Sequence, residues 1–153
     1  HNKSYVTAFY MQYDALIDLY HDKYAKPGKK LYAAAKPLLK PVKFGNKLDF
    51  IWFELWHHEG RRARHGASMM GPDWTHWHGT YDLAKHFYTK YVPELEKLIK
   101  EGKAKNPKAS KNLAKVLKEV LNSDNHKWFL GKMDPAEKAA RKRASDEFKA
   151  RYK

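Results

Sequence analysis

Histidine, arginine and tryptophan are crowded into one stretch of the chain, between Trp52 and Tyr91. The stretch contains six of the nine histidines and the string WHHEGRRARHGASMMGPDWTHWHG. Imidazole nitrogens are common metal ligands, guanidinium groups bind carboxylates, and indole rings pack against flat apolar groups. We therefore predict a functional site in this part of the chain.

The spacing of the histidines excludes the compact zinc site of a helical metalloprotease. His58 and Glu59 are followed by Arg62 where that motif requires a second histidine, and no two histidines of the stretch lie four residues apart. His58 and His65 are separated by about 10 Å along a helix, so they share a face without sharing one ion. This spacing favours single imidazoles donated to several large cofactors.

Haem is a cofactor of that kind, because each axial position of its iron takes one imidazole. The macrocycle favours an aromatic wall, with cations near its propionates. A plainer interpretation stays open from spacing alone, in which the histidines are partly buried in polar networks and the arginines are solvated or paired with carboxylates. The residues concerned are His57, His58, His65, His76, His78, Arg61, Arg62 and Arg64.

The elements that carry these residues are predicted to be helices. Apolar and aromatic residues recur every three or four positions over 5–24, and Pro27 with Gly28 is expected to end that helix. Asn46 is the predicted N-cap of a helix that runs toward His65.

Further stop and start signals continue to the end of the chain. Gly66 is expected to stop the histidine-bearing helix, and a turn at 71–73 precedes a long helix that Pro93 would kink or interrupt. Pro107 lies near the start of another helix, and Asp134 is the predicted N-cap of the last one. Nothing in the sequence predicts a sheet or an internal repeat. The expected fold is an all-α array of five or six helices, some of them long, in a single domain over 1–153.

Composition divides this domain into two parts. Residues 1–92 hold 18 of the 22 aromatics and carry a net charge of +6, whereas residues 93–153 hold four aromatics and carry +8. The first part is predicted to contact the cofactor and the second to support it. Cysteine is absent, so these residues contain no covalent c-type haem attachment and form no disulfide. The formal charge of +14 keeps a basic helical nucleic-acid-binding or assembly module as the alternative function.

The run from Leu48 to Tyr91 resembles the segment that follows the last haem attachment site in octahaem hydroxylamine oxidoreductases. The resemblance includes residues 4–43, with YDALIDLYHDKYAKPGKKLY and KPLLKPVKF, and extends more weakly to the end. Family members carry eight Cys-x-x-Cys-His sites upstream, and this sequence contains none. We expect His1 to be the histidine of the last site and the proximal ligand of its haem, with a haem-bearing part preceding it. An independent cysteine-free subunit is the competing interpretation.

The resemblance implies the C-terminal helical part of a multihaem cytochrome c, assembled as a homotrimer or larger and located in a periplasm or an anammoxosome-type compartment. Several haem c groups would be attached outside this segment, and a redox partner cytochrome is implied. Oxidative members take electrons from hydroxylamine or hydrazine at a haem that is covalently bonded to a tyrosine of a neighbouring subunit. Reductive relatives without that bond reduce nitrite or nitric oxide. Neither nucleic acid nor a membrane span is expected.

The resemblance also assigns roles to individual residues. His65 and His78 are expected to donate distal imidazoles to haem iron, with His57 and His58 as reserves. Arg61 and Arg62 are expected to bind the cofactor. Trp74 aligns with the haem-contacting tyrosine, and Tyr81 is the nearest alternative, so the direction of catalysis stays open.

Overall fold

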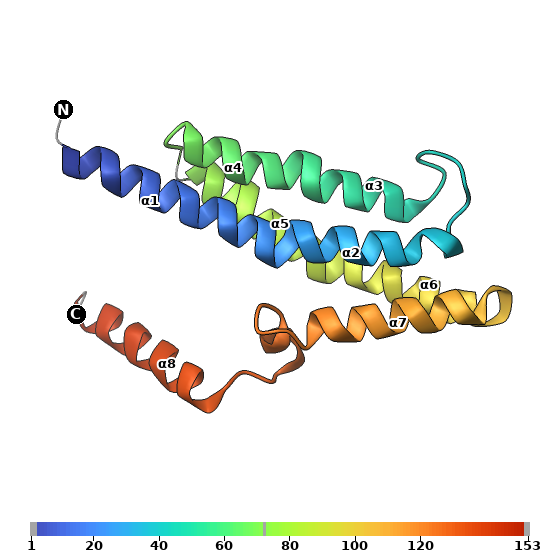
Figure 1. The fold of residues 1–153 in the computed structure, drawn as a ribbon. Helices are drawn as coiled ribbons and strands as arrows, with labels where there is room; N and C mark the ends of the chain where they lie inside the picture. The colour runs from blue at the N-terminus through green and yellow to red at the C-terminus, as the bar shows by residue number, and fades with distance from the viewer. Residues whose placement is uncertain (1–2, 72, 152–153) are drawn as a thin grey trace. The chain divides into compact units, whose positions relative to one another are not determined.

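The computed structural model of the protein describes residues 3–71 and 73–151. Within these ranges the chain forms five long helical runs, one short 3-10 helix between the last two runs, and no strand (Figure 1). The prediction of an all-α array is therefore confirmed.

The runs are built from α-helices joined end to end through wider π-helical turns. The first contains α1 (Lys3–Tyr20), the π turn η1 (His21–Ala25), α2 (Lys26–Ala35) and a 3-10 turn, η2 (Lys36–Leu38). The second contains α3 (Lys47–Phe53), the π turn η3 (Glu54–Glu59) and α4 (Gly60–Ser68). The third contains the π turn η4 (Trp74–Tyr81), α5 (Asp82–His86), the π turn η5 (Phe87–Tyr91) and α6 (Val92–Lys105). The remaining helices are α7 (Pro107–Leu121), the 3-10 helix η6 (Lys127–Leu130) and α8 (Pro135–Ala150).

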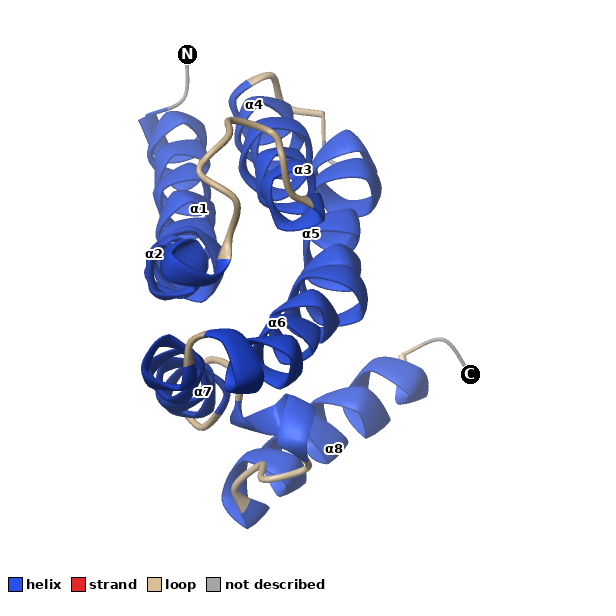
Figure 2. Ribbon diagram, turned by 90° about the vertical axis from the view of Figure 1, so that its right-hand side faces the viewer, coloured by secondary structure: helices blue, strands red, loops and turns tan. Residues whose placement is uncertain are grey.

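The chain divides into two compact units, His1–Lys118 and Glu119–Lys153. In Figure 2 the runs α1–α2 and α3–α4 of the first unit are seen nearly end on, and α5–α6 is seen as a separate, curved run. The predicted division near residue 92 is a different one, between residues that contact the cofactor and helices that support them. It stays a prediction.

Aromatic side chains join the three rods at the α2 end of the first unit. Tyr24 packs edge-on against Phe87 with ring centroids 5.5 Å apart, and the buried hydroxyl of Tyr91 donates to the carbonyl oxygen of Gly28 at 2.9 Å. Trp52 lies 5.6 Å from the ring of Tyr91. A Cβ at Gly28 would collide with this indole, so the glycine permits the close approach of α2 and α3.

The expected end of the helix at Pro27 is wrong, and the helical run is not interrupted at Pro93. Each proline lies at the start of a new α-helical segment, two residues after a π turn. A proline costs least in the first turn of an α-helix, where its missing N–H has no intrahelical partner to lose. Helical runs therefore continue through both prolines.

Two predicted helix starts are confirmed. Asn46 and Asp49 form a capping box at the start of α3, and Asp134 accepts a hydrogen bond from the backbone N–H of Ala136 at 2.7 Å. Asp49 also accepts a hydrogen bond from the Tyr32 hydroxyl at 2.7 Å, which ties α3 to α2. Burial alone would raise the pKa of Asp49, but its hydrogen bonds from Tyr32 and Asn46 outweigh that effect and lower it.

The second unit is small and has little core of its own. His126 is buried within it, and the Lys132 ammonium donates to the Asn122 side chain at 2.6 Å. α8 contains no buried residue. Among residues 3–71 and 73–151, none of the helices has the length and apolar character that crossing a bilayer requires.

Candidate functional site

α4 and η4 cross at very close range because small residues line their contact. A Cβ on Gly79 would lie 2.5 Å from the backbone N and Cα of Ala63, and one on Gly66 would lie 2.5 Å from the Thr75 hydroxyl. Gly66 is therefore a packing residue inside α4, which continues to Ser68, and the expected stop at this glycine is wrong. This crossing fixes the position of α4, which carries His65, relative to η4, which carries His78.

The imidazoles expected to reach a cofactor lie on the surface of these elements. His58, His65 and His78 are all exposed, and His57 is half-buried. No hydrogen bond, ion pair or ring contact joins the His65 side chain to another described residue. Within the described ranges no three residues of the His, Cys, Asp and Glu types are grouped to hold a metal ion. The exposed imidazoles of His58, His65 and His78 are thus available singly to a group outside this chain, whereas His57 is held by its contact with Arg61.

The exposed ring of Trp74 packs against His78 on η4. The ring of Trp74 lies 4.8 Å from that of His78, and the guanidinium of Arg62 lies 5.9 Å from the centre of the indole. Trp74 remains 49% exposed in spite of these contacts. Arg62, Trp74 and His78 are therefore brought together as a cation, an indole and an imidazole on one surface.

Tyr81 lies on the same π turn but has different neighbours. Its ring packs against Trp77 with centroids 5.5 Å apart, and the Lys85 ammonium lies 5.9 Å from the ring centre. Tyr81 is 50% exposed, and its hydroxyl makes no hydrogen bond to a described residue. The two candidates for the haem-contacting position, Trp74 and Tyr81, are thus both accessible.

A second aromatic group follows the outer face of α3 and η3. Phe53 stacks on His57 with ring centroids 4.5 Å apart and planes 14° apart, and Trp56 packs edge-on against the same imidazole at 5.3 Å. Arg61 and the Nε2 atom of His57 are 3.2 Å apart. This contact brings together two of the residues expected to bind the cofactor.

The environment of His57 favours a neutral imidazole. Desolvation, followed by the charges of Arg61 and His58, lowers the pKa of His57 below its ordinary value of 6.5. Its Nδ1 atom is buried and makes no hydrogen bond to a described residue. A neutral imidazole is the form that ligates iron or any other metal.

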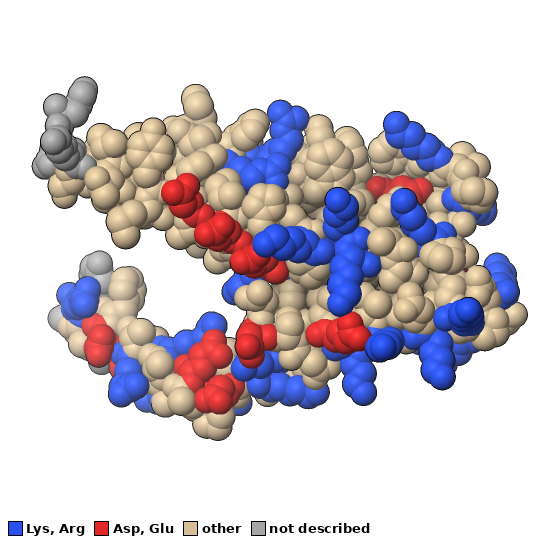
Figure 3. Space-filling view, viewed as in Figure 1, with Lys and Arg blue, Asp and Glu red and all other residues tan. Residues whose placement is uncertain are grey.

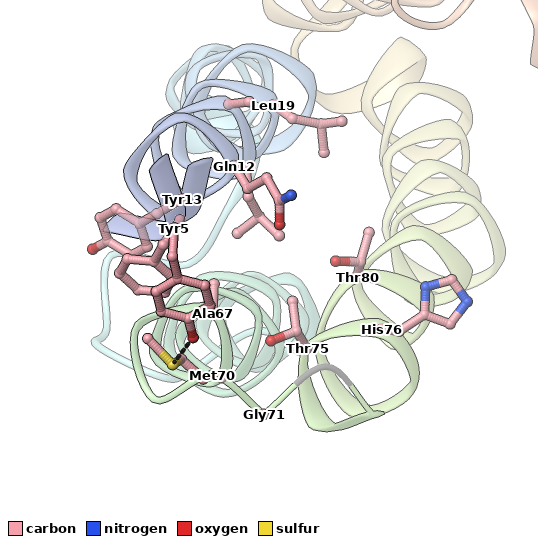
Figure 4. Close-up of a pocket in the computed structure, with 14 residues that line it drawn as sticks. Tyr5, Gln12, Tyr13, Leu19, Ala67, Met70, Gly71, Thr75, His76 and Thr80 are labelled. Atoms are coloured by element: carbon pink, nitrogen blue, oxygen red, sulfur yellow. Dashed lines mark hydrogen bonds between the residues drawn. The ribbon is translucent and has the colours of Figure 1, made fainter. Parts of the chain in front are cut away.

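A cavity of about 820 Å³ lies beside these residues, between α1, α4 and η4. Its walls are mostly apolar, and the Tyr5 hydroxyl touches the Met70 sulfur at 3.3 Å at one side (Figure 4). Gln12 and Thr80 extend toward the open space, whereas His76 extends away from it (Figure 4). None of the histidines expected to bind haem lines this cavity, so it is separate from the surface described above.

One pair of functional groups was missed by sequence reasoning. Glu59 on η3 and His86 on α5 are 27 residues apart in the chain, and the Glu59 Oε1 atom lies 2.6 Å from His86 Nδ1. Their separation matches no metal or catalytic motif, so no signal in the sequence alone could have joined them. The expected proximal ligand His1 lies outside the described residues.

Comparison with protein-family models, with curated proteins and with solved structures finds no significant match to this chain. The resemblance to hydroxylamine oxidoreductases stays a prediction.

Proposed function

We propose that this chain is part of a multihaem cytochrome c oxidoreductase that acts on small nitrogen compounds, for which it supplies haem ligands and subunit contacts. The observation that carries the proposal is the surface formed by η3, α4 and η4. Imidazoles that are exposed and singly placed occur there beside exposed indoles and arginines. A soluble surface gains nothing from exposed tryptophans, whereas a flat cofactor or a covering partner would bury them.

The donor set fits haem better than a bare metal ion. A zinc or copper site needs three or four ligands around one ion, and the described residues offer no such group. Haem iron asks for a single imidazole on each side, and its propionates pair with guanidinium groups. In the proposal His65 and His78 hold iron, His57 and His58 are reserves, and Arg61 and Arg62 pair with propionates.

The residues of this chain would bind and orient the haem c groups, which carry their own covalent attachment outside these residues. When bound, haem c supplies electron transfer and the iron at which the nitrogen substrate reacts. In the proposal, the direction of catalysis depends on whether Trp74 or Tyr81 contacts the haem. A phenol oxygen at the contact position can bond to the macrocycle, and we associate that bond with hydroxylamine or hydrazine oxidation. An indole has no such oxygen, so we associate an indole at this position with nitrite or nitric oxide reduction.

The nucleic-acid alternative has less support. On the face seen in Figure 3, lysine and arginine side chains are interspersed with acidic ones. Several lysines are paired with carboxylates, such as Lys47 with the buried Glu94 at 3.0 Å. A nucleic-acid groove instead needs basic side chains gathered along one track.

The visible spectrum of the protein purified from its natural source tests the proposal. A Soret band with the split features of low-spin haem is expected, together with a haem peptide joined to this sequence in mass spectrometry. A colourless protein whose mass matches the polypeptide alone would contradict the proposal.

A further inference from the structure

The pair formed by Glu59 and His86 lies inside the first unit, where Glu59 is buried and His86 is part-buried. Glu59 is 4% exposed, and its Oε1 atom lies 2.6 Å from His86 Nδ1. Its second oxygen, Oε2, is buried and makes no hydrogen bond to a described residue. The His86 side chain keeps 19% of its surface exposed, and Nε2 makes no hydrogen bond to a described residue.

This arrangement is poor as a purely structural ion pair. A buried carboxylate is costly unless both of its oxygens are satisfied, and here only one is used. Its clear effect is on the imidazole, because the short contact at Nδ1 fixes the ring and leaves Nε2 as the nitrogen without a hydrogen-bond partner among the described residues. An imidazole held in this way by a carboxylate is the usual arrangement of a histidine that ligates a metal.

The backbone next to Glu59 is closely packed. The next residue, Gly60, packs so closely against Tyr20 that a Cβ there would lie 2.5 Å from the tyrosine ring. η3 is thereby held against the first helical run, and the carboxylate cannot easily move with its partner. His86 lies eight residues after His78 on one continuous run, roughly 12 Å along a helix axis, so the two would serve different centres.

We propose that His86 is a further axial ligand of a haem iron, through Nε2, and that Glu59 is its positioning residue. This inference rests on the proposed function. A single metal ion is disfavoured because no third donor of the His, Cys, Asp or Glu types joins the pair within the described ranges. A haem brought from outside these residues needs only the one imidazole.

The first test replaces the ligand. In His86→Gln the side chain retains an amide N–H donor, but it does not bind iron. Electron paramagnetic resonance of the purified haem protein should lose one low-spin haem signal and gain one high-spin signal. His21→Ala is the matched control, because His21 is exposed and has no carboxylate partner, and its spectrum should equal that of the unaltered protein.

The second test addresses the positioning role. Glu59→Gln leaves the imidazole in place but removes the negative charge that makes it a stronger donor. The haem should stay low-spin, and its reduction potential should become more positive. A pair with only a structural role would change the thermal midpoint and leave every potential where it was.

The outcomes distinguish failure of the proposed function from failure of the His86 assignment alone. Absence of low-spin haem from the unaltered protein overturns the proposed function, and the His86 ligand with it. Normal spectra in the unaltered protein and in folded His86→Gln overturn the ligand alone. Circular dichroism verifies folding, and if His86→Gln fails to accumulate, the potential measured in Glu59→Gln decides.

Discussion

His65 and His78 make few contacts of their own, and this determines what their replacement should do. We expect His65→Ala and His78→Ala each to convert one low-spin haem to high spin. The free energy of unfolding should change by no more than about 0.5 kcal/mol, since both side chains are exposed. Optical spectra and urea unfolding of each purified variant measure the two effects. A low-spin spectrum retained in both variants would remove these two residues from the ligand set.

Tyr81 and Trp74 can be distinguished by their chemistry. If Tyr81 is the haem-bonded residue, mass spectrometry of the unaltered protein should find a peptide containing Tyr81 with a haem adduct, and Tyr81→Phe should lack it. Stability should be nearly unchanged in that variant, because the hydroxyl makes no hydrogen bond to a described residue. Release of all haem from residues 73–105 on denaturation would instead leave Trp74 in contact with the haem and favour nitrite or nitric oxide reduction.

Asp49 should make stability depend on pH in the acid range. Its pKa is lowered in the folded protein, so the unfolded chain binds the proton more tightly. The stabilisation is therefore present above the unfolded pKa of about 4 and is lost as the pH falls through the folded value. Asp49→Asn should flatten the change in urea midpoint between about pH 5 and pH 2. A variant with the same acid slope as the unaltered protein would show that other carboxylates cause it.

The contact between α4 and η4 is the element on which the site depends. Gly79→Ala should destabilise the first unit by about 1 to 3 kcal/mol, because the new methyl group meets the backbone of Ala63 and the backbone cannot give way. Gly71→Ala is the control, since its nearest contacts would be ordinary ones at 3.6 and 3.7 Å. Thermal unfolding compares the two variants. Equal midpoints would mean that the two helices can separate at little cost.

Sequence patterns predicted the helices better than their connections. The side chains of Asn46 and Asp134 act locally, so their capping roles follow from a few neighbouring residues. Continuation through Pro27 and Pro93 could not be predicted, because it depends on π turns that have no recognised sequence signal. Gly66 looked like a stop, but its position is fixed by Thr75 on another run.

The candidate site was predictable only as a crowded stretch. Composition located the histidines, but their exposure depends on which helix face meets the core. The contact of Trp74 with Arg62 and the pairing of Glu59 with His86 both join separate elements. Such contacts follow from tertiary packing, which spacing along one helix does not encode.

At the scale of the whole molecule, the formal charge of +14 should govern how fast it meets an electron carrier. An acidic cytochrome would be drawn to this net positive charge, and salt would screen that attraction. We expect the rate of electron exchange with an acidic carrier to fall several-fold as ionic strength rises from low to physiological values. Stopped-flow measurement at two salt concentrations tests this. Equal rates would remove electrostatic steering.

The π turns also bear on how such chains diverge. Each i→i+5 turn holds one residue more than an α turn, so it amounts to a single-codon insertion absorbed without breaking the helix. Loss of one residue between Glu54 and Glu59 would let this stretch close into a regular α-helix, and the residues that follow would keep nearly the same face. His65 would then stay on its present face, although the sequence would differ by a single gap. A descendant with that deletion would change the spacing of the histidine motif and keep the geometry of the residues beyond it.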